Sequence, residues 1–326
     1  MDMEITTANK NKLEKWQKAF FKKIEAKGRS LNTIKNYRTD LACFNQYVTE
    51  SAKQTSIEQY SILEILEYGK FLEAKYNSDN SRRRRVQALR IFFDHLVEEG
   101  IFNANPVRKI PTSPKFLDIP RPATFSHIKS LWHTILNDQR TAKNDLEKLK
   151  AKRNGIIFSA IYLGGLKVSE LSKIKVSSFS FRDEIKAVIT HEKRDPYTVT
   201  FPAIFGRLFY EYVELLEKVK KEQGHNFPHL LFNANAHKIL SGGLSARGME
   251  LLFEEWRSQL MIQITPKSLR QSCIFTWLHN GVNETTMKEW LGVSPAYSLR
   301  PYKEHMDKHF YNDQFIELAM NEDKLI

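Results

Sequence analysis

One stretch, TPKSLRQSCIFTWLHNG at residues 265–281, constrains the fold of this chain more than any other. Thr265 can cap a helix, and Pro266 suits its first turn, where a missing backbone N–H costs nothing. Gly281 stands where a left-handed C-terminal cap is expected. The residues between them predict a helix with an apolar face, formed by Leu269, Cys273, Phe275, Trp277 and Leu278.

The start of this helix carries positive charge. Lys267 and Arg270 are three residues apart, so both project from one side of the first turn. Positive charge at a helix start opposes the macrodipole, whereas the free N–H groups there favour an anion. The pair therefore indicates an anionic partner. A solvated basic turn is the alternative, and it is the simpler reading of this stretch by itself.

The residues after Gly281 add a second short helix and a tyrosine. Asn283 caps a helix that runs to Leu291 and stops at Gly292, and Tyr302 follows after a turn. This arrangement resembles the active-site segment of the tyrosine recombinase (phage integrase) family. Segments in the first half of the chain are also similar to that family, in its order: residues 30–41 (SLNTIKNYRTDL), residues 85–96 (RVQALRIFFDHL) and Asn105-Pro106.

The resemblance implies a mainly α fold with a small β-hairpin or sheet. Residues 1–110 are expected to form an N-terminal SAM-like helical core-binding domain. Residues 123–326 are expected to form a C-terminal tyrosine recombinase catalytic-like domain with a C-terminal helix. Residues 111–122 contain four prolines and read as an extended linker. In the family, the two halves form a clamp around the duplex.

Apolar spacing places the individual elements. The polar run 137–152 is either a helix extension or a loop. We expect strands at 184–190 and 197–201, and helices at 11–27, from Ser30 through Val48, at 57–75, from Arg82 through Leu96, and at 126–136, 154–163, 205–221 and 245–260.

Composition limits the class of protein. The chain has 326 residues, 41% of them hydrophobic, which suffices for two domains. A net charge of +12 indicates a polyanionic partner, with nucleic acid first. The longest apolar run, residues 155–164, is too short to span a membrane, and the N-terminus lacks a secretory signal. We therefore expect a cytoplasmic, nucleoid-associated protein.

No cofactor is expected from the sequence. Cys43 and Cys273 are the two cysteines, and both fall on helical faces as buried thiols of a reducing compartment. No Cys/His cluster has metal-ligand spacing, and no Gly-rich phosphate loop is present. Neither a metal nor a nucleotide cofactor is predicted.

Basic residues of the first half predict contacts with double-stranded DNA. The run Arg82–Arg85 is expected to open a helix, where four like charges repel each other and phosphates would relieve the repulsion. A solvated charge run is the alternative. Arginine to guanine is the commonest specific base contact. The predicted DNA-binding residues are Lys35, Arg38, Arg82, Arg83, Arg84, Arg85, Gln87 and Arg90.

The family resemblance assigns roles residue by residue. In the family, a tyrosine attacks a DNA phosphate without a metal, two arginines neutralise the phosphate, and a hairpin lysine protonates the leaving oxygen. Tyr302 takes the nucleophile position, Arg270 that of the second arginine and Lys267 the helix position. Lys193 is the hairpin lysine, with Arg194 as a second possibility.

Two positions depart from the family pattern. Lys167, within Gly165-Leu166-Lys167, replaces the first arginine, and Val293 replaces the His or Trp that follows the glycine. Lysine keeps the charge but loses the planar two-pronged donor. Losing one transition-state donor costs on the order of 10²–10³ in rate. Valine donates nothing.

These departures favour a sequence-specific double-stranded DNA-binding protein whose catalysis is lost or severely weakened. Its simplest role is that of a transcriptional regulator or repressor of a mobile element. The enzyme alternative is an active but divergent recombinase that makes a 3′-phosphotyrosyl DNA intermediate. An accessory subunit that pairs with an active recombinase is a third possibility.

The segment after Tyr302 predicts self-association on DNA. Its apolar residues at helical spacing are Phe310, Phe315, Leu318 and Ala319. Family members dock such a helix on a neighbouring subunit. Packing of the helix against its own chain is the alternative.

Overall fold

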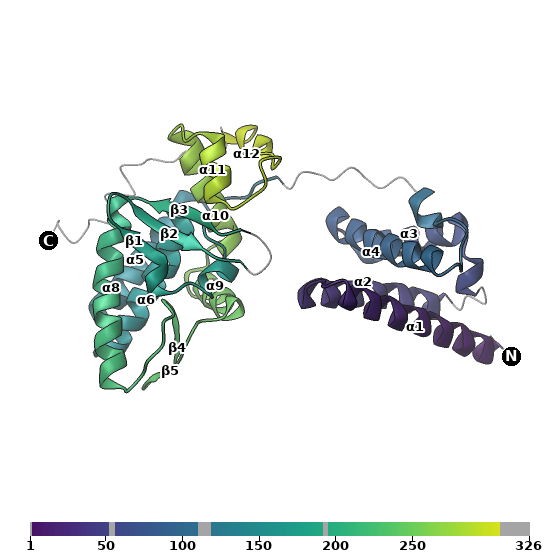
Figure 1. The fold of residues 1–326 in the computed structure, drawn as a ribbon, viewed down its shortest axis with the longest axis horizontal. Helices are drawn as coiled ribbons and strands as arrows, with labels where there is room; N and C mark the ends of the chain where they lie inside the picture. Colours follow the sequence, from purple (N-terminus) through teal and green to yellow (C-terminus); the bar gives the residue numbers. More distant parts are fainter. Residues whose placement is uncertain (1, 52–55, 110–118, 192–194, 307–326) are drawn as a thin grey trace. The chain divides into compact units, whose positions relative to one another are not determined.

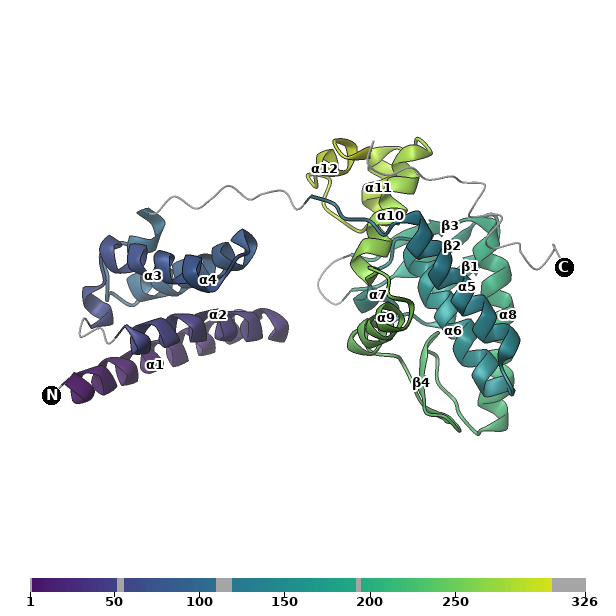
Figure 2. The same ribbon diagram turned by 180° about the vertical axis from the view of Figure 1, so that it is seen from behind.

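The computed structural model describes residues 2–51, 56–109, 119–191 and 195–306, with side chains described from residue 12 onward. The chain divides into two compact units, Met1–Leu117 and Asp118–Ile326 (Figures 1 and 2). The described residues are mainly helical with two small antiparallel sheets, which confirms the predicted fold class. The linker predicted at 111–122 lies mostly outside the described residues, and its bounds stay a prediction.

The first unit is a helical bundle around an aromatic core. Its helices are α1 (Asp2–Ala26), α2 (Leu31–Glu50), α3 (Ile62–Lys75) and α4 (Asp79–Glu98). Ser30 caps α2 as predicted, because its Oγ accepts from the N–H of Thr33. The predicted helix 57–75 is wrong at its start. Ser61 and Glu64 form a capping box that begins α3, so residues 57–59 make a separate 3₁₀ turn. The fully buried rings include Phe20, Phe44, Tyr68, Phe92 and Phe93.

Helix α4 begins three residues earlier than the arginine run. Ser78 is its N-cap and Asp79 lies in its first turn, where a carboxylate suits the macrodipole. Arg82–Arg85 therefore do not open the helix, and the expectation of a penalty at the helix start is wrong. The sequence signal was present in Ser78-Asp79, a cap followed by an acidic residue.

The second unit begins with two long helices, α5 (Phe125–Thr141) and α6 (Asp145–Tyr162). The sequence predicts either a helix extension or a loop at residues 137–152, and each alternative is correct for a part of them. Helix α5 extends through Thr141, the chain breaks, and the side chain of Asn144 caps α6 by accepting from the N–H of Glu147. The remaining helices are α7 (Val168–Leu171), α8 (Ala203–Glu222), α9 (Ala246–Leu260), α10 (Pro266–His279), α11 (Glu284–Trp290) and α12 (Arg300–Lys303).

Two antiparallel sheets complete this unit. One has the order β1-β2-β3, from strands Phe179–Phe181, Ile185–Ile189 and Tyr197–Phe201, and β2 pairs with β3 so that Ala187 faces Val199. The second pairs β4 (Phe232–Ala234) with β5 (Ile239–Gly242). The hairpin of β2 and β3 confirms the expected strands. Strands β1 and β5 were not predicted, because segments of three or four residues show too little alternation.

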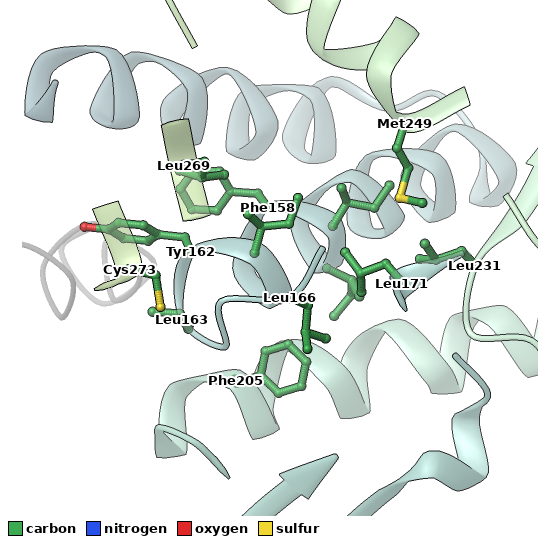
Figure 3. Packing of buried hydrophobic residues seen from close by; sticks show 14 of the residues in the cluster. Phe158, Tyr162, Leu163, Leu166, Leu171, Phe205, Leu231, Met249, Leu269 and Cys273 are labelled. Carbon is green, nitrogen blue, oxygen red and sulfur yellow. The ribbon is translucent and has the colours of Figure 1, made fainter. Parts of the chain in front are cut away.

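Helix α10 forms the centre of the second unit. Thr265 caps it through the N–H of Ser268, Pro266 opens it and Gly281 follows with φ +70°, all as predicted. The helix is buried on nearly all sides rather than on one face, since Gln271, Ser272 and Thr276 are buried too. Figure 3 shows Leu269 and Cys273 of α10 in the cluster that also contains Leu166 and Leu171. None of the described helices is long and apolar enough to span a membrane.

Candidate functional site

Arg270 ties three segments of the second unit together. From the first turn of α10, its Nε donates to the carbonyl of Gly165, in the turn after α6. Its Nη2 donates to the carbonyl of Leu291 at the end of α11, at 3.4 Å. Hydrogen bonds from a charged group are stronger than neutral ones. The guanidinium therefore fixes the turn before Lys167 and the turn before Val293 relative to α10.

Both of these turns require glycine. Gly165 has φ +61°, and a Cβ there would lie 2.8 Å from the ring of Trp277. Gly292 has φ +57°, and a Cβ there would lie 2.3 Å from the ring of Tyr197. Only glycine combines a positive φ with such a close approach. The Gly-Leu-Lys and Leu-Gly-Val segments are thus held where the site needs them.

Lys167 is held by a buried carboxylate. Its Nζ donates to Oε1 of Glu170 at 3.0 Å, and its backbone N–H donates to Oε2 at 2.8 Å. Burial by itself would raise the pKa of Glu170. The hydrogen bonds and charge of Lys167, together with the hydroxyl of Tyr197, outweigh it and hold that pKa below its ordinary value. His191 Nε2 lies 3.7 Å from the same carboxylate. The ammonium group of Lys167 is therefore already paired within the fold.

Tyr302 lies in α12 with its side chain turned into the unit. The residue is 9% exposed, and its ring packs edge to face on Phe275 with centroids 5.5 Å apart. Burial and the neighbouring Tyr297 raise the pKa of the hydroxyl to about 12, against the lowering effects of a hydrogen bond with Gln271 and the charge of Arg270. The tyrosine thus lies beside Arg270, as a phenol that ionises with difficulty.

A groove of about 650 Å³ adjoins these residues. Arg270 and Lys167 line it together with Lys267, which is exposed at the start of α10. The groove joins α9, the start of α10 and the start of α7, with apolar walls from Val168, Phe253 and Pro266 and further charged groups from Glu250, Glu254 and Arg257. Among the described residues, no group of three or more His, Cys, Asp or Glu could hold a metal ion.

The other predicted positions are placed as follows. Val293 is half-buried against the hydrophobic core, and its N–H donates to the carbonyl of Lys288. Lys193 and Arg194 lie outside the described residues. Gln271 and Tyr297, which contact the Tyr302 hydroxyl, were not predicted. Gln271 lies on α10 next to Arg270, but it also accepts from the N–H of Arg121 across the fold, and no sequence spacing indicates such a contact.

Arg82 and Arg85 of the arginine run make contacts within their own domain, and Arg84 is half-exposed. Arg85 is buried, stacks on the ring of Tyr76 at 3.7 Å and donates to the carbonyl of Ser81. Its assignment to an exposed DNA-binding face is wrong. Arg82 donates to the carbonyl of Tyr76 and pairs with Asp79. Arg84 donates from Nε and Nη2 to one oxygen of the buried Asp40, although half of its side chain is exposed.

The remaining predicted DNA-binding residues are more accessible. Lys35, Arg38 and Gln87 are exposed, and Arg83 and Arg90 are half-buried. Arg38 pairs with Glu25 at 3.2 Å and covers the ring of Phe21. Nη1 of Arg90 lies 3.4 Å from Oε1 of Gln87. Lys35, Arg83, Gln87 and Arg90 are thus at least partly accessible.

A helical unit is thus followed by a unit in which Lys167, Lys267 and Arg270 line one groove and Tyr302 lies within the influence of the Arg270 charge. The family model for the phage integrase N-terminal SAM-like domain matches residues 18–100. Tyrosine recombinase XerC of Listeria monocytogenes serotype 4b (strain F2365) is 23% identical over 284 residues, which span 85% of this chain and 89% of the relative. The chain is thus similar to tyrosine recombinases over most of its length.

Solved structures show the same fold. A lambda integrase(75-356) dimer bound to a COC′ core site superposes with a TM-score of 0.60 and 15% identity, covering 86% of this chain and 94% of that one. The XerH site-specific recombinase bound to palindromic difH substrate gives a TM-score of 0.63 and 15% identity, covering 90% of this chain and 81% of that one.

Proposed function

We propose that this protein binds double-stranded DNA with sequence preference on its tyrosine recombinase scaffold. One observation carries the proposal: Lys267 and Arg270 of α10 line a single groove together with Lys167, from the start of α7. Converging cations suit the phosphodiester backbone, which supplies most of the affinity in protein–DNA binding. The net charge of +12 acts in the same direction at longer range.

The first unit supplies the surface for sequence preference in this proposal. Gln87 and Arg90 lie one helical turn apart on α4, and both side chains are of types that read base edges. Lys35 and Arg83 contribute phosphate contacts. The match of residues 18–100 to the SAM-like domain of phage integrases supports this assignment.

The same geometry argues for lost or severely weakened strand cleavage. Burial and Tyr297 raise the pKa of Tyr302, at the expected nucleophile position, to about 12, which makes its phenolate rarer at neutral pH than that of an ordinary tyrosine. Lys167 is paired with Glu170, and Val293 offers no donor to a phosphate. Arg270 and Lys267 line the groove as cations for a phosphate, and the role of Lys193 stays a prediction. A protein of this kind acts by occupying DNA, and we propose a transcriptional regulator or repressor of a mobile element.

A second candidate function is that of an active, divergent recombinase. The observation that favours it is the placement of the Tyr302 hydroxyl under the influence of the Arg270 charge. The relatives are named tyrosine recombinases, and the XerH structure is a post-cleavage complex. In this reading Tyr302 forms a 3′-phosphotyrosyl link, and Lys167 suffices in place of arginine.

One experiment separates the two candidates. The purified protein is mixed with fragmented DNA of its source genome, and bound fragments are recovered with and without SDS. We expect fragments that are retained only under native conditions, with a recurring sequence. SDS-resistant adducts that vanish in Tyr302→Phe would establish the recombinase instead. Failure to enrich any sequence would overturn the proposed DNA binding.

Regulation is tested with a reporter placed beside a recovered site. We expect the wild-type protein and Tyr302→Phe to repress it equally, because occupancy requires no phenol. Arg270→Met is the control for loss of the groove. Repression that depends on Tyr302 would contradict the regulator.

Self-association on DNA remains a further part of the proposal. The predicted segment lies in residues 307–326, outside the described residues. The solved lambda integrase complex is a dimer on its core site, which supports the idea. Deleting residues 312–326 should lower the cooperativity of DNA binding, measured by titration of a DNA with two recovered sites. An unchanged binding curve would contradict it.

A further inference from the structure

A residue outside the family pattern adds a guanidinium to the groove. Arg257 lies in the last turn of α9 and lines the groove together with Lys167, Lys267 and Arg270. Buried Phe253, one helical turn earlier, fixes the rotation of α9 and so directs this face toward the groove. The placement is set by packing and involves no motif that the sequence reveals.

The nearby carboxylates are paired with another arginine. Glu250 and Glu254 share this face of α9, and Nη1 of Arg247 lies 3.4 Å and 3.0 Å from their oxygens. Within the described ranges, the ion pairs do not include Arg257, which is half-buried. The charge of Arg257 is therefore presented to the groove rather than neutralised along the helix.

In the part of the chain that the structure describes, Arg270 and Lys167, unlike Arg257, use their donors in hydrogen bonds within the fold. Arg270 uses Nε and Nη2 on the carbonyls of Gly165 and Leu291. Lys167 donates to Glu170. The guanidinium of Arg257 therefore offers an anion in the groove two N–H donors that lie in one plane.

We propose that Arg257 binds the DNA phosphodiester that occupies the groove and supplies the two-pronged donor that Lys167 lacks. The inference rests on the proposed DNA binding and names the residue that compensates for the departure at position 167. A fork of two parallel N–H donors matches two non-bridging oxygens of one phosphate. Lysine offers a single point charge there.

The test compares Arg257→Gln with Arg182→Gln on a duplex oligonucleotide that contains a site recovered by genome capture. Arg182 is exposed between β1 and β2 and does not line the groove, so its variant controls for loss of one charge. We expect Arg257→Gln to weaken binding by roughly tenfold at moderate salt and to reduce the salt slope by about one. Arg182→Gln should stay within about twofold of wild type.

Two further variants make the inference specific. Arg257→Lys keeps the charge but loses the fork, so it should retain the salt slope and recover only part of the affinity. Adding Lys167→Arg to Arg257→Gln returns a guanidinium to the groove and should restore most of the binding. Thermal unfolding of each variant checks that the fold is retained.

The outcomes separate the inference from the proposed function. Failure of the wild-type protein to capture DNA would overturn both. Capture by wild type with equal affinities for Arg257→Gln and Arg182→Gln would overturn the role of Arg257 alone. Loss of binding that Lys167→Arg fails to restore would assign Arg257 a phosphate other than the one beside Lys167, and would overturn the compensation.

Discussion

The arginine run of the first unit and the groove of the second unit distribute positive charge in opposite ways. Arg82, Arg84 and Arg85 are neighbours in sequence, yet they turn toward Tyr76, Asp40 and the domain interior. Lys167, Arg257 and Arg270 come from three different elements, the start of α7, α9 and α10, yet they line one groove. Successive helical residues point about 100° apart, so a contiguous run disperses its charge.

The comparison shows that charge density along the chain is a poor guide to charge density in space. Arg82, Arg84 and Arg85 each contact neighbours within their own domain, and these contacts stabilise the domain. A groove concentrates charge because separate elements are fixed around it, here by Arg270 and two glycine turns. The convergent set is therefore the stronger candidate for anion binding, and the run is the weaker one.

The largest expected effect comes from restoring donors to the groove. Lys167→Arg with Val293→His supplies a fork and an imidazole at the two positions that depart from the family pattern, and one restored transition-state donor is worth on the order of 10²-fold in rate. We expect SDS-resistant adducts on a recovered site to rise by about that factor. Lys186→Arg, in β2 and paired with Glu184, is the matched control and should change nothing. Unchanged adduct levels would mean that the groove lacks a further catalytic group.

The next effect concerns the residue that assembles the groove. Arg270→Met leaves the carbonyls of Gly165 and Leu291 without their charged donor. Hydrogen bonds to charged groups contribute about 1.5–3 kcal/mol each, so loss of the two bonds should lower the free energy of unfolding by about 3–6 kcal/mol. Chemical denaturation followed by tryptophan fluorescence measures it. Arg257→Met should lower the free energy of unfolding by less than about 0.5 kcal/mol. A loss similar to that of Arg270→Met would contradict the view that Arg270 holds the groove together whereas Arg257 only binds the anion.

The fold was largely readable from the sequence where caps and periodicity agree. Helix α10 begins at Pro266, as the cap residue Thr265 indicated, and α9 (Ala246–Leu260) fits the helix expected at 245–260. The errors fall where a local signal was overlooked or too short. Ser78-Asp79 begins α4, Ser61 separates α3 from a 3₁₀ turn, and β1 is only three residues long.

The candidate site was readable only in part. Arg270, Lys267 and Lys167 could be placed together because a family resemblance supplies contacts between distant segments. Arg257 and Gln271 could not, since their contacts depend on how helices pack rather than on spacing. The burial of Arg85 was also hidden, because a cation can leave solvent when an aromatic face such as Tyr76 receives it.

A smaller effect sharpens the contrast within the arginine run. Arg84→Ala leaves the buried carboxylate of Asp40 without its partner, and the free energy of unfolding should fall by about 1–2 kcal/mol. Arg83→Ala should cost less than about 0.5 kcal/mol but should weaken DNA binding and its salt dependence. Denaturation and DNA titration of both variants measure the contrast. Equal losses of stability would show that the run is not divided in this way.

The smallest expected effect appears only at acid pH. Because the folded-state pKa of Glu170 lies below its ordinary value of 4.5, the ionised carboxylate stabilises the fold above that pH, and the contribution is lost as pH falls through the folded value. Urea denaturation between neutral and acid pH should show that Glu170→Gln loses less stability than wild type over this window. Asp94, whose pKa is lowered by Arg108, titrates equally in both proteins and cancels in the difference. Identical slopes would mean that Lys167 does not depend on the charge of Glu170, and that its ammonium group is available to a phosphate in the groove.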